Sequence, residues 1–294
     1  MKYLIIANEF SGTDKGRKVL AETETYFSNH SLEYTLHRTE YTRHATQLTK
    51  DAVSAGYKFI IGIGGDGTFN EIVNGLDLDK DSDVSLAFIP SGSGNDFVRN
   101  TNLKGSTTEI LDYIFQNHPT KVDCCIVNDT KFINMCGLGL DVELVLRQQK
   151  IKKVFKGQMS YYLALMYTIF AIRFRKMRYS IDDGELVEEP LLLLAVGNGT
   201  TYGGGLPIAP LAEIRDGFLD VCVIKKLPRL SVPRLLIKFL KGKHIGEKKY
   251  VNYYKCKKLY VECDSPYPVN IDGELFLYPP CKFEIVHQCL NVYI

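Results

Sequence analysis

The sequence FIIGIGGDGTFNE, residues 59–71, places glycines and a carboxylate between an apolar run and a helix-like segment. Glycines allow the backbone to turn sharply and to approach a ligand closely. Thr68 and Glu71 fit the T-x-x-E capping box, which predicts that a helix begins at this loop. Free amides at a helix N-terminus attract anions, so a phosphate is the expected ligand. Asp66 is negative, and we expect it to act through Mg²⁺ or by ordering the loop and the nucleotide. A tight turn without a ligand is the alternative.

Two further loops of this kind follow predicted strands. They are FIPSGSGNDFVRN at 88–100 and ANEFSGTDKG at 7–16. In an open α/β sheet, ligands bind outside the carboxyl ends of the strands, so three such loops favour a nucleotide-binding crevice. The chain contains no GxxxxGK[ST] and no GxGxxG after the first strand. A P-loop enzyme and the dinucleotide-binding fingerprint are therefore excluded.

A parallel sheet is needed to position these loops, and residues 1–122 have its pattern. The apolar runs lack polar alternation and are separated by helical segments, which indicates strands buried on both faces. We predict a doubly wound α/β domain over this range. The expected strands are 3–7, 32–37, 58–63 and 84–89, and the expected helices are 16–29, 42–55, 68–76 and 107–117.

The pattern changes in residues 123–294, which we predict to form an antiparallel β-sandwich domain. Asn128-Asp129 is typical of a hairpin turn between two strands. A helical block is expected at 140–176 and a basic helix near 230–242. The expected strands are 121–127, 131–136, 177–181, 191–196, 219–224, 257–262, 269–271, 275–278 and 283–286.

Composition limits the class of protein. The net charge is +2, with 45% hydrophobic and 24% charged residues, which is typical of a globular protein and not of a nucleic-acid-binding one. The longest apolar stretch, 161–172, has twelve residues, whereas a transmembrane helix needs about 20. The N-terminal apolar run is too short for a signal peptide, which favours a cytoplasmic protein. The eight cysteines form no CxxC pair and are expected to be reduced and buried.

Taken in order, the motifs resemble those of bacterial soluble lipid kinases with a diacylglycerol kinase catalytic domain. Sphingosine and ceramide kinases belong to the same family. GGDGT is shared with NAD kinases and is similar to a phosphofructokinase motif, but the later motifs are specific to lipid kinases. The matching segments are Gly64–Thr68, Pro90–Arg99, Gly197–Gly205, Asp216–Val221 and Asp272–Glu274.

The resemblance implies an ATP- and Mg²⁺-dependent transfer of a phosphoryl group to a lipid alcohol, most simply diacylglycerol. It implies that Asp272 is the general base and that Glu274 is its partner or the base itself. It also implies a structural Mg²⁺ held by the Asp216 carboxylate and by the backbone carbonyls of Glu213 and Phe218. The ATP-binding residues that it implies are Asn8, Ser11, Gly12, Thr39, Gly64, Gly65, Asp66, Gly67, Thr68, Asn70, Glu71, Ser93, Asn95 and Asp96.

Several positions allow a second interpretation. By spacing alone, Asp272-Gly273 is a β-hairpin turn, and Asp183-Gly184-Glu185 is expected to be a surface hairpin. Glu9 stands where the family has a proline, which adds negative charge near the expected phosphates. Ser93 replaces a threonine and keeps the hydroxyl. Glu9 is the only hint of a non-catalytic nucleotide or lipid sensor.

Basic residues are concentrated in 225–250, which holds nine Lys or Arg against one acid. A second basic group, 147–178, surrounds the apolar stretch 161–172. Basic amphipathic helices suit an anionic membrane surface, although a solvated helical face is the alternative. We therefore expect a cytoplasmic enzyme that binds membranes peripherally and transiently. A homodimer is compatible with the resemblance, and a sphingoid lipid or an NAD-like alcohol is the alternative acceptor.

Overall fold

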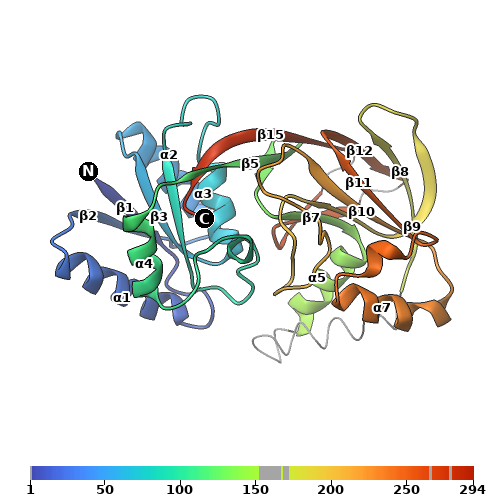
Figure 1. Cartoon of the computed structure of the whole chain (residues 1–294), viewed down its shortest axis with the longest axis horizontal. Helices are drawn as coiled ribbons and strands as arrows, with labels where there is room; N and C mark the ends of the chain where they lie inside the picture. The colour runs from blue at the N-terminus through green and yellow to red at the C-terminus, as the bar shows by residue number, and fades with distance from the viewer. Residues whose placement is uncertain (1, 152–166, 168–171, 265–266, 278–279) are drawn as a thin grey trace. The chain divides into compact units, whose positions relative to one another are not determined.

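The structure is a computed structural model that describes residues 2–151, 167, 172–264, 267–277 and 280–294 (Figure 1). The chain divides into two compact units. Unit 1 is Met1–Cys124 with His287–Ile294, and unit 2 is Cys125–Val286. The sequence expectation assigned 123–294 to one domain, whereas the last eight residues lie with unit 1. Most of the apolar stretch 161–172 lies outside the described residues.

Unit 1 is built on a parallel sheet in the order β2-β1-β3-β4, and the C-terminal end of β15 pairs with β4. Asn291 and Val292 of β15 lie opposite Ser85 and Leu86. The strands are β1 (Tyr3–Ala7), β2 (Tyr34–Arg38), β3 (Phe59–Gly64) and β4 (Ser85–Pro90), with β5 (Thr120–Val127) leading into unit 2 and β15 (Cys281–Val292) returning from it.

Helices cover both faces of this sheet. Helix α1 packs against α4, and α2 packs against α3. Every residue of β3 is buried, as the uninterrupted apolar pattern predicted. The doubly wound α/β prediction is confirmed. The helices are α1 (Lys15–Asn29), α2 (His44–Ser54), α3 (Asp66–Asn74) and α4 (Thr107–Gln116), and a 3₁₀ turn, η1, covers Phe97–Asn100.

Unit 2 is an antiparallel β structure, as predicted. Its strands follow the order β14-β13-β7-β9-β8-β12-β15, and β10 and β11 extend from β9. The strands are β6 (Thr130–Phe132), β7 (Met135–Gly139), β8 (Arg175–Ile181), β9 (Val187–Gly197), β10 (Leu219–Lys225), β11 (Val251–Cys256), β12 (Lys258–Cys263), β13 (Pro268–Ile271) and β14 (Glu274–Leu277). The helices in its described residues are α5 (Leu140–Ile151) and α7 (Val232–Leu240), with 3₁₀ turns η2 (Arg229–Ser231) and η3 (His244–Gly246).

Alternate residues of β9 face two different hydrophobic clusters. Leu194 and Val196 lie in the cluster shared with β8, β12 and β15. Leu193 and Ala195 lie in the cluster that receives the inner side of α7. The two-residue period of a strand thus places apolar side chains on both faces, which is why β9 reads as a continuous apolar run.

Several details of unit 2 differ from the sequence prediction. Strand β8 begins at Arg175, inside the expected helical block 140–176, of which 152–166 and 168–171 lie outside the described residues. The expected strand 131–136 is two strands, because the chain breaks its pairing between β6 and β7. Strand β11 was not predicted, although β10 pairs with it along its whole length. Strand β15 continues to Val292 rather than ending at 286. Leu290 and Val292 are buried, so the C-terminal segment is part of the core of unit 1.

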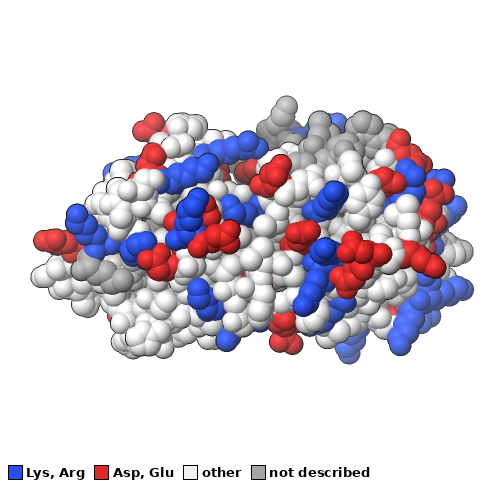
Figure 2. Space-filling view, turned by 90° about the horizontal axis from the view of Figure 1, so that it is seen from above, with Lys and Arg blue, Asp and Glu red and all other residues white. Residues whose placement is uncertain are grey.

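The surface carries both signs of charge. On the face shown in Figure 2, Lys and Arg side chains lie among Asp and Glu side chains. This mixture agrees with the small net charge of +2. Among the residues that the structure describes, no helix is long and apolar enough to cross a membrane.

Candidate active site

In unit 1, the loops after β1, β3 and β4 pack directly on one another. A Cβ atom at Gly12 would lie 2.1 Å from the carbonyl oxygen of Ser91, and Gly12 has φ +60°. A Cβ atom at Gly92 would lie 2.5 Å from the Cα atom of Gly65. The hydroxyls of Ser11 and Ser91 are 2.5 Å apart. Glycine is required at these contacts because no side chain fits between the backbones.

Helix α3 begins at the glycine loop, as predicted, but the predicted capping box is wrong. Gly65 is the N-cap, the helix starts at Asp66, and no side chain caps it. Thr68 therefore lies inside the first turn, where its side chain fills the space that a Cβ at Gly64 would need, 2.4 Å away. The Thr68 hydroxyl accepts a hydrogen bond from the Asn8 amide at 3.4 Å, which joins the first and second loops.

Glu71 stabilises a different helix from its own. Its carboxylate accepts hydrogen bonds from the backbone amides of Arg43 at 2.8 Å and Ala45 at 3.0 Å, at the N-terminus of α2. Arg43 has φ 68° and offers no capping side chain. A carboxylate at a helix N-terminus is favourable for the helix dipole. Glu71 therefore stabilises the N-terminus of α2. Asn70 is likewise engaged within α3, where it accepts from the Asn74 amide at 2.9 Å.

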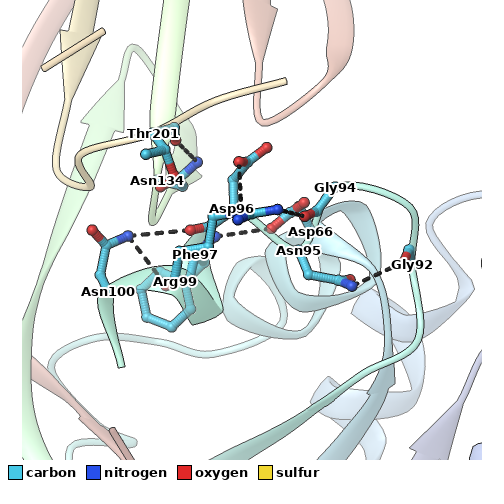
Figure 3. Close-up of polar contacts among 10 residues, drawn as sticks. All are labelled: Asp66, Gly92, Gly94, Asn95, Asp96, Phe97, Arg99, Asn100, Asn134 and Thr201. Atoms are coloured by element: carbon cyan, nitrogen blue, oxygen red, sulfur yellow. Dashed lines mark hydrogen bonds and ion pairs between the residues drawn. The ribbon is translucent and has the colours of Figure 1, made fainter. Parts of the chain in front are cut away.

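Asp66 and Asp96 form a pair of neighbouring carboxylates (Figure 3). Asp66 accepts a hydrogen bond from the backbone amide of Phe97 at 3.1 Å. Burial raises the pKa of Asp66, the negative charge of Asp96 raises it further, and amide hydrogen bonds oppose the shift. Asp96 is itself 4% exposed and forms an ion pair with Arg99 at 3.4 Å. Two carboxylates in this position repel each other unless a cation or a proton lies between them.

The polar side chains of the third loop differ in burial and in hydrogen bonding. Asn95 has φ 51°, and its amide donates to the carbonyl of Gly92 at 2.8 Å, while its own carbonyl oxygen is buried without a partner (Figure 3). Ser93 is exposed. In the β2 loop, Thr39 donates its backbone amide to Ala7 at 2.9 Å. Thr39 is thus tied to the end of β1.

The unusual Glu9 has a partner. Its carboxylate accepts a hydrogen bond from Arg38 Nε at 2.8 Å. This hydrogen bond is the main reason that the pKa of Arg38 is raised. The negative charge that Glu9 adds beside the first loop is therefore balanced by a guanidinium at the end of β2.

In unit 2, Asp272 lies in a two-residue turn between β13 and β14. Asp272 has φ 46° and Gly273 has φ 95°, as a type I′ hairpin requires. The Asp272 carboxylate is 9% exposed and accepts from two backbone amides, Met135 at 2.7 Å and Ile133 at 3.1 Å. The turn interpretation and the buried carboxylate are therefore both present at this position. Glu274 follows at the start of β14 and is half-buried.

Sequence reasoning missed a buried carboxyl group in the same unit. Asp141 is 4% exposed, and it accepts a hydrogen bond from the Asn270 amide at 2.8 Å. Gly137 makes room for it, because a Cβ there would lie 2.0 Å from Asp141 Oδ2. Burial raises the pKa of Asp141 to about 7, and the Asn270 hydrogen bond opposes the shift. An acid inside the apolar run MCGLGLDVELV, residues 135–145, was the available signal.

Asp216, the expected metal ligand, is engaged by protein groups. Its carboxylate accepts from the backbone amide of Phe218 at 3.0 Å and forms an ion pair with Lys255. Lys255 also lies 4.0 Å from Asp220, which is fully buried. The carbonyl of Glu213 accepts from the amide of Arg215 at 2.8 Å. A cation bound at Asp216 would have to displace the Lys255 ammonium. Within the described part of the chain, no cluster of three or more His, Cys, Asp or Glu side chains could hold a metal.

Family models match almost the whole chain. Residues 2–127 match the diacylglycerol kinase catalytic domain. Residues 134–294 match the YegS C-terminal NAD kinase beta sandwich-like domain. The two matches correspond to the α/β and β-sandwich parts described above.

Individual relatives agree with the family models. The chain is 30% identical to a diacylglycerol kinase of Bacillus subtilis, over 98% of this chain and 94% of that protein. It is 33% identical to a YegS-like lipid kinase of Chromohalobacter salexigens, over 80% of this chain and 73% of that protein. A crystal structure named as a diacylglycerol kinase of Bacillus anthracis superposes with a TM-score of 0.81 at 26% identity, covering 99% of this chain and 94% of that one. An NAD kinase of Archaeoglobus fulgidus shares the fold at 12% identity, with a TM-score of 0.56 over 100% of this chain and 94% of the other.

Proposed function

Because the chain belongs to the family of bacterial diacylglycerol kinases and YegS-like lipid kinases, we propose that it is an ATP- and Mg²⁺-dependent lipid kinase. The proposed reaction moves the γ-phosphoryl group of ATP to the hydroxyl of a lipid alcohol. Diacylglycerol is the first candidate, and its product is phosphatidic acid. The bond between the γ-phosphorus and its bridging oxygen breaks, a bond to the acceptor oxygen forms, and ADP leaves.

The observation that carries this proposal is the packing of three strand-end loops in unit 1. Gly12 fits against Ser91, and Gly65 fits against Gly92, at the carboxyl ends of adjacent parallel strands. Backbone amides and small polar groups gathered at such an edge favour a polyphosphate. The N-terminus of α3 adds the positive end of its dipole. We assign the ATP phosphates to these loops, with Asn8, Thr68, Ser93 and Asn95 as the polar side chains nearest to them.

Asp66 and Asp96 fit the chemistry of the Mg²⁺ that accompanies ATP. Burial and, after it, the negative charge of Asp96 raise the pKa of Asp66. Magnesium prefers oxygen ligands, and a divalent cation would offset the repulsion between the two carboxylates. When bound, the ion neutralises phosphate charge during transfer. Glu71 is better explained as the cap of α2 than as a ligand. The structural ion that the resemblance implies at Asp216 fits poorly, because Lys255 already supplies positive charge there.

We assign the acceptor's proton to Asp272 or Glu274. Phosphoryl transfer requires a carboxylate to accept the hydroxyl proton as the new bond forms. The backbone amides of Ile133 and Met135 donate hydrogen bonds to the Asp272 carboxylate and fix its position. Each oxygen of a carboxylate has two lone pairs, so Asp272 can accept both amides and still receive a proton.

The alternatives now have less support from the residues. The sensor hypothesis depended on Glu9, and Arg38 balances that charge. The NAD kinase alternative depends on the GGDGT loop and on a shared fold, and a likeness at 12% identity concerns the fold alone. A sphingoid lipid remains the alternative acceptor within the lipid kinase proposal.

The test is ATP consumption in the presence of Mg²⁺ and anionic vesicles, with and without diacylglycerol. We expect turnover that depends on diacylglycerol and that is lost in Glu274→Gln or Asp272→Asn. A sphingoid base and NAD serve as parallel acceptors. Turnover with NAD alone would overturn the lipid assignment, and ATP binding without turnover on any acceptor would favour the sensor. Since Asp272 also holds two amides, each variant is first compared with the wild type by thermal melting.

A further inference from the structure

Helix α7 has an apolar stripe on the side that packs against the strands of its own unit, unit 2. Val232 and Leu235 are buried in the cluster beside β9 and β10, and Phe239 packs against it. These residues recur at intervals of three and four, which is the spacing of one helix face. A surface helix is expected to be polar on its other side.

The other side of α7 is also apolar. Leu230, Ile237 and Leu240 are 95%, 57% and 50% exposed, and Pro233 between them is exposed as well. Positions 233, 237 and 240 of α7 follow the three- and four-residue spacing of one helix face, and Leu230 lies in the 3₁₀ turn η2 that precedes the helix. The segment 229–241 thus presents to solvent an outer apolar stripe that nothing in the described chain covers.

Cations flank this outer stripe. Arg229, Lys241 and Lys243 are exposed around its two ends. Arg234 is 73% exposed and Lys238 is 37% exposed, and both form ion pairs with Glu247. Glu247 is the only acid between residues 225 and 250, where there are nine Lys or Arg. The surface around the outer stripe is therefore strongly positive, unlike the mixed charge on the face in Figure 2.

We propose that this outer stripe and its flanking cations dock unit 2 on an anionic lipid bilayer. The inference rests on the proposed function in one respect only, since a lipid alcohol must be collected from a membrane. Exposed leucine and isoleucine side chains enter the boundary between headgroups and acyl chains, and the cations meet the lipid phosphates. A partner protein or a second copy of this chain would cover the outer apolar stripe equally well. The cations that flank the stripe favour an anionic surface.

A cavity beside α7 supports this choice of occupant. It measures about 290 Å³ and is lined by Ser231, Arg234, Leu235, Glu247, Lys249 and Tyr250. Arg234 is one helical turn from Ile237, so the cavity adjoins the outer stripe. Two of its lining side chains are cationic, two carry hydroxyl groups, and one, Glu247, is a carboxylate that is paired with Arg234 and Lys238. A lipid phosphate that reaches the cavity can therefore exchange its water for hydrogen-bond donors.

The experiment measures sedimentation of the full chain with vesicles of phosphatidylglycerol and phosphatidylcholine, without ATP or diacylglycerol. We expect binding to the anionic vesicles that weakens as salt is added. The variant Leu230→Glu/Ile237→Glu should lose about tenfold or more of this affinity, since it removes apolar contacts and adds negative charge. Leu186→Glu is the matched control, because Leu186 is 51% exposed on the β8–β9 turn, away from α7, and should bind as the wild type does.

Two results would overturn the docking surface. One is wild-type affinity of the Leu230→Glu/Ile237→Glu variant for anionic vesicles. The other is a wild-type dimer in sedimentation equilibrium that this variant converts to monomer, which would make the outer stripe a contact between copies. Turnover of a short-chain, water-soluble diacylglycerol separates the two proposals. If the variant loses vesicle binding and still turns over the soluble diacylglycerol like the wild type, the docking proposal is supported. If the wild type binds vesicles but shows no turnover, the kinase assignment alone is wrong.

Discussion

Two hairpin turns of unit 2 contain the same three letters, Asp-Gly-Glu, in different registers. In the β13–β14 turn, the left-handed pair is Asp272 and Gly273, with φ 46° and 95°. In the β8–β9 turn, the left-handed pair is Asp182 and Asp183, with φ 48° and 58°. The residue that corresponds to Asp272 is therefore Asp182, one position before the tripeptide. Spacing alone would have matched the wrong aspartate.

The two corresponding aspartates each accept hydrogen bonds from two backbone amides, but they differ in burial. Asp182 accepts from the backbone amides of Lys257 at 2.8 Å and Lys258 at 2.9 Å, and it is exposed. Asp272 accepts from two amides of β7 and its preceding residues and is 9% exposed. Exposed Asp183 has only a loose ion pair with Lys258 at 3.5 Å. Burial, rather than motif or turn type, distinguishes the candidate catalytic carboxylate.

The largest difference between the turns should be in activity. Asp272→Asn is expected to lower kcat by about 10² to 10⁴, the usual contribution of a proton-accepting side chain, with ATP affinity nearly unchanged. Asp182→Asn should stay within about twofold of the wild type, since its surroundings are those of a surface turn. Both are measured by steady-state kinetics and by nucleotide titration. A folded Asp272→Asn enzyme with lost ATP affinity or normal kcat would break the comparison.

Stability should separate the two turns next. Asp272→Ala leaves two buried amides without acceptors, and each unsatisfied group costs about 1–3 kcal/mol. We expect a total loss of about 3 kcal/mol, against about 1 kcal/mol or less for Asp182→Ala, where water replaces the carboxylate. Urea unfolding monitored by circular dichroism measures both. Equal losses would show that burial does not distinguish the turns.

Asp141 allows the effect of burial on a carboxyl group to be tested where fewer amides donate to it than to Asp272. Its pKa is raised from 3.8 to about 7 in the folded protein, so ionisation opposes folding. Stability should therefore fall as the pH rises from about 4 to about 7 and then level off. Asp141→Asn cannot ionise, and its free energy of unfolding should gain on the order of 4 kcal/mol relative to the wild type between about pH 4 and about pH 8. A constant difference across this range of pH would contradict the assignment.

The smallest effect is expected at a third Asp-Gly turn, Asp216-Gly217. Lys255→Met removes the cation that lies near Asp216 and Asp220, and loss of the partly exposed Lys255–Asp216 pair should cost about 1 kcal/mol. The carboxylates then lack a counter-ion, so we expect the melting temperature of the variant to rise with Mg²⁺ and that of the wild type to change less. Thermal melting in Mg²⁺ and in a chelator measures this. A strong Mg²⁺ dependence in the wild type alone would show that a metal displaces Lys255.

Much of the fold could be predicted because its signals are local. The parallel strands of unit 1 were predicted from uninterrupted apolar runs. The glycine loops were predicted from short motifs of consecutive residues. Strand β1 was predicted at the residues it occupies, 3–7, and a helix was correctly expected after β3, although α3 begins at Asp66, inside the GGDGT segment, and not at 68. These features depend on neighbours within a few residues, which a sequence displays directly.

Only the tertiary structure decided which groups those residues meet. Glu71 looked like a cap for its own helix, but it caps α2 through an amide 28 residues away. Asp272 takes its partner from Met135, 137 residues earlier. The side-chain partners of Glu9, Asp141 and Asp216 are likewise far along the chain: they are Arg38, Asn270 and Lys255, at separations of 29, 129 and 39 residues. The sequence by itself determined the order of elements and the chemistry carried at their ends. The fold decided burial and pairing, because both depend on contacts between segments that no local pattern records.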